Sequence, residues 1–409
     1  MTTNALTAGS RLASLDVIRG VAVLGILLMN IQSFAMIGQA YSNPTAYGDF
    51  TGANRWVWIL SHVFADQKFM TIFSLLFGAS MLLIIQSAQR KGQSALRLHY
   101  RRNLWLLLIG LAHAYLIWYG DILTPYAICA LLLYPAHKLS PKAALILGVI
   151  LFSVASMLEL GLGLSMPYWP EEVTQSMQGN WLPDQAQVQQ EIAAYQGSYL
   201  DQLTMRVYTA LALQTTYVPL HILWRVLGLM LMGMALFKTG FLAGGLPTST
   251  YRNVAWGAGL PGLVLVVIGV VGHLQADFDL AYSMFLGGQW NYWGSLGMAL
   301  AYISLIILWV KSQQGQAFKA RLATVGRMAL SNYLLQSLIA AFLFYGLGLF
   351  GEVSRVGQLL IVLGVWGLQL AYSPWWMARF HYGPFEWAWR SLTQGKRQPW
   401  RKLKTAEAA

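Results

Sequence analysis

The sequence predicts an all-α fold: a polytopic membrane helix bundle of about ten transmembrane helices, with both termini in the cytoplasm. Composition is the first observation. Hydrophobic residues make up 56% of the 409 residues and charged residues only 10%, whereas about a quarter of a typical soluble domain is charged. The second observation is a series of apolar stretches of about 20 residues. The third is the placement of Lys and Arg in alternate connecting segments, which follows the positive-inside rule.

The apolar stretches share a length that can cross the hydrocarbon core of a bilayer. With soft boundaries, they are 15–37, 66–87, 103–119, 121–137, 142–165, 214–237, 254–273, 286–310, 328–350 and 356–376. The first is longer than a signal-peptide core and no small-residue cleavage site follows it, so we interpret it as a retained helix. The third and fourth are short, and they either tilt or form a tight helical hairpin around Gly120.

The formal net charge of +12 indicates membrane sidedness rather than nucleic-acid binding, because the chain has too little polar surface for that class of protein. With the N-terminus inside, most Lys and Arg fall in cytoplasmic segments and the outer segments hold few. No Lys or Arg occurs between Lys142 and Arg206. We therefore expect the basic face to meet anionic lipid head groups.

We expect one transmembrane domain over 1–409, with an outer segment at 167–205 and a basic cytoplasmic tail at 377–409. The outer segment is polar, Gln-rich and acidic, and Asp184 directly after Pro183 indicates the start of a short helix. A connection of this length is usually functional or disordered, and a lid on the substrate side is the functional interpretation.

Ionisable and polar residues inside spans are costly, so each is a candidate functional residue with a structural alternative. Asp16 and Arg19 share a face at the start of the first span, where they form either an anchoring ion pair or the polar cytoplasmic mouth of a cavity. Asn30 lies farther along the same helix, where it either bonds to a neighbouring helix or offers a polar donor to the bundle interior.

Two further pairs have the spacing of one helical turn. His62 and Asp66 lie at the outer entrance of the second span, with Lys68 just beyond. The carboxylate can orient the His for general-base work, or the three residues can form an interfacial cluster that anchors the helix. His221 and Arg225 suggest either an anionic ligand group or a buried carboxylate partner.

His113 lies about ten residues into a strongly apolar span, and Asp121 follows near its outer end. On one straight helix the two side chains are about 80° apart and cannot bond directly. Both can nevertheless face one cavity, and Gly120 can bend the chain. The alternative is a structural His, which would need a buried partner.

Arg327 precedes a helix on which Asn332 and Gln336 share a face. This polar stripe either lines a water-filled cavity or bonds to neighbouring helices. Cys129 is the only cysteine, so no intrachain disulfide forms. The seven His residues are scattered without ligand spacing, so we expect no metal site.

Five segments occur in an order that resembles the YeiB-like family, a family of bacterial inner-membrane proteins of unknown function. They are SLDVIRGVAVLGILLMNI, FMTIFSLLFGAS, GLAHAYLIWYGDILTPYAI, GRMALSNYLLQS and GPFEWAWR. The resemblance spans nearly the whole chain and implies a multi-pass protein of the bacterial inner membrane. In the YeiB-like pattern, His113 and Asp121 are the characteristic pair.

The first two spans also resemble, more distantly, the transmembrane acyltransferase superfamily, which includes heparan-alpha-glucosaminide N-acetyltransferase. The shared features are an LDxxRG start with Asp16 and Arg19, Asn30 in the outer half of the first span, and Asp66 before the second. In the heparan enzyme group the catalytic His lies in the intervening outer loop. Here that loop offers only His62, whose spacing to Asp66 is shorter than in that group.

The resemblance implies acyl transfer from a cytoplasmic acyl-CoA, such as acetyl-CoA, to a cell-envelope glycan, lipid or small molecule at the outer face. We expect His113 to be the base, with support from Asp121 and a polar donor in Asn30. The expected CoA-binding residues are Arg19, Arg101, Arg102, Arg327 and Asn332. The expected residues of the substrate cavity are Asp16, His62, Asp66, Lys68, His221, Arg225 and Gln336.

Two other classes of function use the same residues. A transporter or flippase for a small molecule, lipid or glycan would also need a polar cavity, protonatable groups and an outer lid. No inverted repeat or pair of broken helices is visible in the sequence to support it. A non-catalytic assembly protein is the third interpretation, and a homodimer is an open alternative to a monomer.

Overall fold

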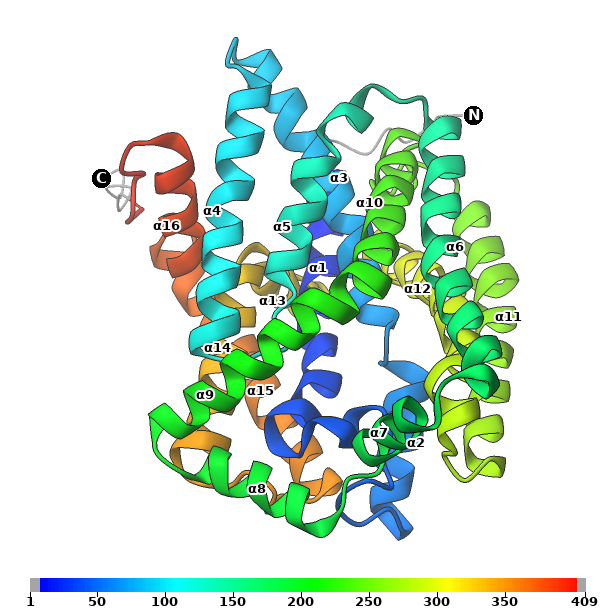
Figure 1. Cartoon of the computed structure of the whole chain (residues 1–409). Coiled ribbons are helices and arrows are strands. Elements are labelled where there is room, and N and C mark those ends of the chain that lie inside the picture. Colours follow the sequence, from blue (N-terminus) through cyan, green and yellow to red (C-terminus); the bar gives the residue numbers. More distant parts are fainter. Residues whose placement is uncertain (1–7, 403–409) are drawn as a thin grey trace.

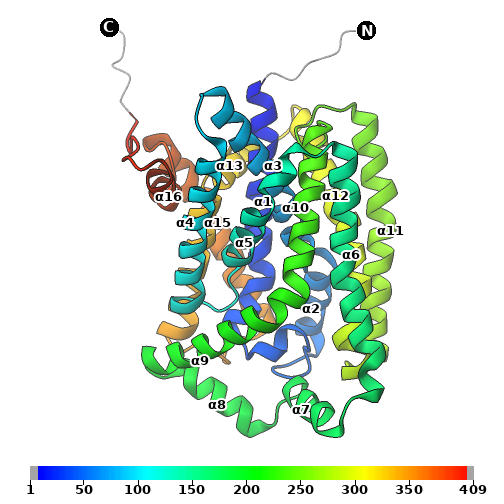
Figure 2. The same ribbon diagram turned by 45° about the horizontal axis from the view of Figure 1, so that its top comes forward.

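The computed structural model describes residues 8–402, and within that range it is a bundle of helices without a strand. Figure 1 shows long helices running side by side, with α7, α8 and α9 gathered at one end of the bundle. The start of α1 and the short helix α16 lie towards the other end, as Figure 2 shows from a second direction. The molecule therefore has one end covered by polar helices and one end rich in basic connections.

The helices follow one another with short connections. They are α1 (Ala8–Ala35), η1 (Gly38–Tyr41), α2 (Gly52–Phe64), α3 (Lys68–Arg90), α4 (Ala95–Leu116), α5 (Leu123–Leu132), η2 (Tyr134–Lys138), α6 (Pro141–Ser165), η3 (Met166–Tyr168), α7 (Glu171–Trp181), α8 (Gln185–Gln196), α9 (Tyr199–Ala212), η4 (Leu213–Ile222), α10 (Leu223–Lys238), α11 (Thr248–Gln275), η5 (Tyr282–Leu286), α12 (Gly288–Lys311), α13 (Gln316–Arg327), α14 (Ala329–Ala341), η6 (Phe342–Gly346), α15 (Arg355–Arg379) and α16 (Pro384–Gln394). The segments η1 to η3 are 3₁₀-helices, and η4 to η6 are π-helices.

The all-helical membrane character expected from the sequence is confirmed. Eight helical segments of the described chain are long and apolar enough to cross a membrane by length and composition. They contain all of the expected spans except the third and fourth, which form a helical hairpin of α4 and α5. Because α5 has only 10 residues, it rises about 15 Å, half of a hydrocarbon core. The count of about ten crossings therefore stays a prediction.

The outer segment is folded into helices. The helix expected from Asp184 is present as α8, and its start is a capping box in which Asp184 and Gln187 bond each other's backbone N–H groups. α7 and α9 flank it and were not foreseen individually. The role of this segment as a lid stays a prediction. The basic tail is described only to residue 402, and 403–409 lie outside the described residues.

α1 is the central helix, because its residues belong to three separate apolar clusters on different sides of it. It crosses α13 closely where Gly20 meets Gly326. A Cβ atom at position 20 would lie 2.1 Å from Leu322 O, and one at position 326 would lie 1.9 Å from Asp16 O. Such close crossings of small residues are typical of membrane helices. This one brings the polar start of α1 against the end of α13.

Candidate functional site

The turn between α4 and α5 brings His113 and Asp121 together in what we call the His113 centre (His113, Asp121 and Trp118). His113 Nδ1 lies 2.8 Å from Asp121 Oδ1, and each side chain is only 1% exposed. The expectation that the two cannot bond directly is wrong, because it assumed one straight helix. α4 ends at Leu116 and the chain reverses over 117–122, so Asp121 returns beside the last turn of α4.

Asp121 is fixed by the start of α5, since its Oδ2 accepts a hydrogen bond of 2.7 Å from Thr124 N. An ionised carboxylate can only accept, so Nδ1 of His113 carries the proton of this bond. The lone pair of the neutral ring is then on Nε2. This atom is buried and has no hydrogen-bond partner among the described residues. A carboxylate-oriented imidazole with a free Nε2 is the arrangement of a general base.

Aromatic rings surround the imidazole. The ring centroid of Tyr333 lies 5.3 Å from that of His113, and the ring centroid of Trp118 lies 6.3 Å away. Trp118 stacks on Phe34 of α1 at 4.2 Å. Its indole Nε1 is buried and also lacks a partner within residues 8–402. Because buried polar atoms are nearly always paired, these two unpaired nitrogens mark a place that a polar ligand atom can complete.

Asn30 lies one helical turn before Phe34 on α1, and residues four apart share a helix face. Its side chain is half-buried and makes no hydrogen bond to any residue that the structure describes. Its amide group is therefore available on the side of α1 that Trp118 contacts. The role of Asn30 as a donor stays a prediction.

The outer segment contacts the end of α4 that carries His113. Arg206 and Tyr199 of α9 both donate hydrogen bonds to Leu116 O, at 2.9 and 3.1 Å. On α8, Glu191 accepts a bond of 3.0 Å from Gly38 N, and burial raises the pKa of this carboxyl group. None of these three contacts was foreseen, because polar residues of an outer segment carry no hydropathy signal for burial.

A second polar centre lies where α3, α10 and α12 meet. We call it the Arg225 centre (Arg225, Gln67, Thr71, Ser295, His62, Asp66, Lys68 and Asn291). Arg225 is 0% exposed and donates to Gln67 Oε1 at 2.6 Å and to Thr71 Oγ1 and Ser295 Oγ at 3.0 Å. No carboxylate of the described chain lies within ion-pair distance of it. The sequence left open whether Arg225 binds an anionic ligand or a carboxylate of the protein. In the structure its described hydrogen-bond partners are neutral acceptors.

The expected cluster around Asp66 is buried inside the protein, since Asp66 is 6% and Lys68 0% exposed. Asp66 accepts a bond of 2.7 Å from Asn291 Nδ2 and one of 3.1 Å from Tyr41 OH. Its Oδ2 lies 3.3 Å from Nδ1 of His62. Lys68 donates to Asn291 Oδ1 at 2.5 Å and to His62 O at 2.8 Å. In the Arg225 centre, Nε2 of His62 and Nε of Arg225 are buried without a described partner.

His221 has a partner that the sequence did not single out. Its Nδ1 lies 2.5 Å from Glu159 Oε1, at ion-pair distance but without the alignment of a hydrogen bond. Glu159 lies on α6 and also accepts a bond of 2.9 Å from Gln289 Nε2. The signal for Glu159 was present, because an acid inside the apolar stretch 142–165 is costly. His221 and Arg225 therefore bind different groups.

The basic end of the bundle brings several expected residues together. Asp16 and Arg19 form an ion pair of 3.0 Å, and Arg327 lies near enough to Asp16 for their charges to interact. The guanidinium of Arg102 lies 3.5 Å from the ring centroid of Trp389 on α16. Arg19 in turn lies within electrostatic range of Arg102. Three expected CoA-binding arginines thus face one region.

Other expected residues lie elsewhere. Arg101 lines a surface groove along α4 that Arg102 does not line. Asn332 is fully buried and donates to Val325 O at 3.1 Å. Gln336 is buried and donates to Val23 O of α1 at 3.1 Å. Both amides therefore bond to neighbouring helices, which is one of the two alternatives expected for this polar stripe. The contact of Asn332 with CoA stays a prediction.

Comparison with known proteins adds relatives of similar length. Residues 236–396 match a family model described as "Protein of unknown function (DUF418)". The uncharacterized protein YeiB of Escherichia coli (strain K12) is 34% identical over 398 residues, which cover 94% of this chain and 96% of that protein. The uncharacterized protein YxaH of Bacillus subtilis (strain 168) is 31% identical over 413 residues, covering 95% and 96%. No solved structure is a significant match.

Proposed function

We propose a function for this chain, which belongs to the YeiB-like family of proteins of unknown function, from the chemistry of its own residues. It is a membrane-embedded acyltransferase that moves an acyl group, acetyl in the simplest case, from cytoplasmic acyl-CoA to an acceptor at the outer face. The observation that carries the proposal is the buried His113–Asp121 pair with its unpaired Nε2. The expected YeiB-like resemblance is confirmed, whereas the resemblance to acyltransferases stays a prediction.

The chemistry needs one base and one oxyanion donor. His113 Nε2 takes the proton of an acceptor hydroxyl or amine as that oxygen or nitrogen attacks the thioester carbonyl. Asp121 holds the imidazole and offsets the positive charge that it gains. The tetrahedral intermediate then breaks its C–S bond, and His113 returns the proton to the CoA thiolate. Asn30 and the indole N–H of Trp118 are the available oxyanion donors.

The distance between the basic end and the His113 centre supports this arrangement. Arg19 and Asn30 are separated by eleven residues on α1, and Arg102 and His113 by eleven on α4. Both separations correspond to a rise of roughly 16 Å, which an extended pantetheine arm can span. α1 and α4 pack in the same apolar cluster. Arginines at one end can therefore hold phosphates while the thioester reaches the base.

The topology belongs to the same proposal. Eight membrane-spanning segments plus the two arms of the α4–α5 hairpin make the ten crossings, and the positive-inside rule assigns the basic end to the cytoplasm. The bacterial relatives fit a location in the inner membrane. Membrane lipids, an envelope glycan, lipid or small-molecule acceptor, and a homodimer are the partners that this proposal allows.

The test uses the purified full-length protein in nanodiscs. Acetyl-CoA should raise the melting temperature more than free CoA or ATP does, and free thiol should accumulate when a panel of hydroxyl and amine acceptors is added. His113→Ala should still be stabilised by acetyl-CoA but should release no CoA. His381→Ala, which alters an exposed His, is the matched control. Wild-type protein that neither responds to acetyl-CoA nor releases CoA would overturn the proposal.

A second candidate function, transport, is favoured by one observation. The Arg225 centre lies beside η4, a π-helix of 10 residues that interrupts the helix between α9 and α10 and contains Pro219 and His221. A second π-helix, η5, precedes α12. Interrupted helices beside ionisable groups occur in transporters and π-helices at functional sites. Proton flux in proteoliposomes that is abolished by Asp66→Asn would favour transport over acyl transfer.

A further inference from the structure

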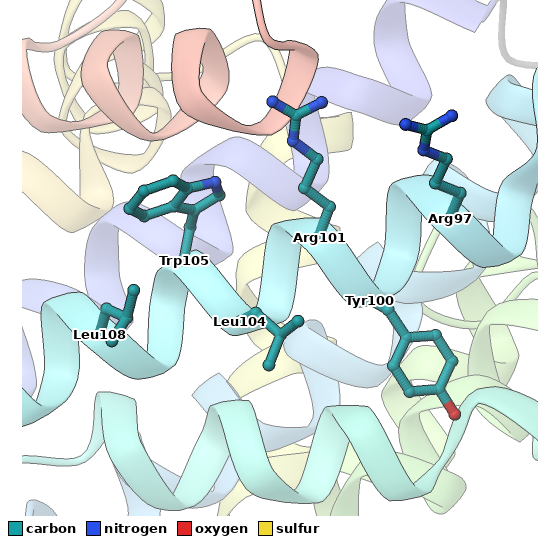
Figure 3. Close-up of a pocket in the computed structure, with 6 residues that line it drawn as sticks. All are labelled: Arg97, Tyr100, Arg101, Leu104, Trp105 and Leu108. Carbon is teal, nitrogen blue, oxygen red and sulfur yellow. The ribbon is translucent and has the colours of Figure 1, made fainter.

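We propose that a groove on the lipid-facing side of α4 binds one anionic phospholipid at the basic end of the bundle. The groove has a volume of about 650 Å³. Figure 3 shows the residues that line it, which are Arg97, Tyr100, Arg101, Leu104, Trp105 and Leu108. This site is separate from the His113 centre, and its occupant takes no part in the proposed reaction.

The groove is about as long as one leaflet of a bilayer is thick. Like a leaflet, it has a charged end and an apolar part. Its basic part is Arg97 and Arg101, whose guanidinium groups project from the same side of α4 in Figure 3. Its apolar part continues to Leu108. The rise along α4 from Arg97 to Leu108 is roughly 16 Å, and half of a hydrocarbon core is about 15 Å. A phospholipid with its phosphate beside the arginines would place its acyl chains along the apolar part.

The two guanidinium groups have no protein anion to pair with. Neither makes a hydrogen bond or an ion pair with a described side chain. The sequence contains no Asp or Glu between Asp66 and Asp121. Arg101 lies against the end of α16, where a Cβ atom at Gly395 would be 2.7 Å from its guanidinium. A helix C-terminus carries only a partial negative charge, so a phosphate is the group that complements both arginines.

The apolar part decides between a lipid and a nucleotide. Leu104 and Leu108 are 50% and 54% exposed, and a nucleotide bound at the arginines would leave them uncovered. The neighbouring Arg102 does not line the groove, and its guanidinium stacks on Trp389. Arg101 therefore belongs with Arg97 and the leucines rather than with Arg19 and the expected CoA phosphates. An anionic phospholipid covers the charged and the apolar parts together.

The experiment measures which lipid the full-length chain retains. Nanodiscs contain equal amounts of phosphatidylglycerol and phosphatidylcholine with the same acyl chains, and native mass spectrometry counts the lipids bound to the released protein. The test variant is Arg97→Gln/Arg101→Gln. The control is Lys142→Gln/Arg252→Gln, which removes two exposed positive charges from the same predicted face. Size-exclusion profiles check that both variants fold.

Wild type and the control should prefer phosphatidylglycerol, and the groove variant should lose that preference by roughly tenfold or more. Leu104→Gln/Leu108→Gln should weaken long-chain phosphatidylglycerol while leaving the dihexanoyl form unaffected. If the groove variant and the control lost the preference for phosphatidylglycerol equally, the attraction would be diffuse and the proposed site would be wrong. Displacement of the lipid by acetyl-CoA, or no effect of the leucine variant, would overturn the site as well. Acyl transfer is not measured, so this result is independent of the proposed reaction.

Discussion

The His113 centre and the Arg225 centre are both buried, polar and inside the membrane bundle, but they differ in how many partners each key residue has. His113 has one described hydrogen-bond partner, Asp121. Arg225 has three, on two other helices. The number of charged residues in a centre therefore does not tell which of the two centres can bind a further partner. His113 Nε2 has no described partner, whereas the bonds of Arg225 to Thr71 and Ser295 join its helix to α3 and α12.

The largest expected effect is on the rate of acyl transfer. The test compares two buried histidines, His113 and His62, whose Nε2 atoms have no described partner. His113→Ala should lower the rate of acyl transfer by about 10²–10⁴-fold, the usual contribution of a general base. His62→Ala should lower it by less than tenfold, because His62 lies in the Arg225 centre. The measurement is CoA release from acetyl-CoA at saturating acceptor. The opposite ranking would move the chemistry to the Arg225 centre.

Arg225→Ala should have the next largest effect, on stability rather than on chemistry. It removes a buried cation and leaves the oxygens of Gln67, Thr71 and Ser295 without their donor. We expect a loss of at least about 1–3 kcal/mol in the free energy of unfolding, the cost of leaving a buried acceptor without its donor. Denaturant unfolding in detergent measures it. Arg252→Ala at an exposed position should cost almost nothing, and a similar loss there would contradict the comparison.

A smaller effect concerns the contact between the outer segment and the His113 centre. Arg206→Leu removes the cation at the C-terminus of α4, where it bonds Leu116 O. Such a charge at a helix end contributes about 1–2 kcal/mol at most in a partly buried setting. Hydrogen exchange of 113–121 should increase, and CoA release should fall with it. Tyr208→Leu, an exposed position on the same helix, should change neither.

The smallest effect is a pH dependence in the same segment. Burial raises the pKa of Glu191 above its ordinary value of 4.5, which the bond from Gly38 N offsets in part. A raised pKa means that the docked segment binds the proton more tightly than the free segment does. Acidification from the raised pKa towards 4.5 should therefore tighten docking of α8. Limited proteolysis of α8 at two pH values measures it, and Glu191→Gln should remove the dependence.

Eight of the ten expected spans correspond to long apolar helical segments of the described chain, because hydropathy reports directly on apolar helix length. The hairpin of α4 and α5, the helix from Asp184 and the Asp16–Arg19 pair all follow from local sequence. The helices α7 and α9 were not foreseen individually, since α7 is polar and α9 runs from the polar segment into the next apolar stretch. The π-helices η4 and η5 were missed for another reason: their bonding pattern leaves no residue signature.

The candidate site was predictable only where one residue was unusual for its surroundings. His113 stood out because an ionisable group in an apolar span is costly. Its bond to Asp121 was not predictable, because it depends on where α4 ends. The neutral acceptors of Arg225 come from residues as distant as Thr71 and Ser295. Such contacts depend on the packing of three helices, and no spacing in the sequence encodes them.

The bonds that Arg206 and Tyr199 make to Leu116 O join two parts that a membrane enzyme would need to move separately. If α9 swings away to admit an acceptor, the last carbonyl of α4 loses both donors. The turn that carries Asp121 would then lose this anchor. His113 would lose its alignment with Asp121 as a result. Admission and catalysis would therefore be mutually exclusive states of the same hinge. If the proposed function holds, the base would be ready only while the outer entrance is shut, and hydrolysis of the thioester by entering water would be suppressed.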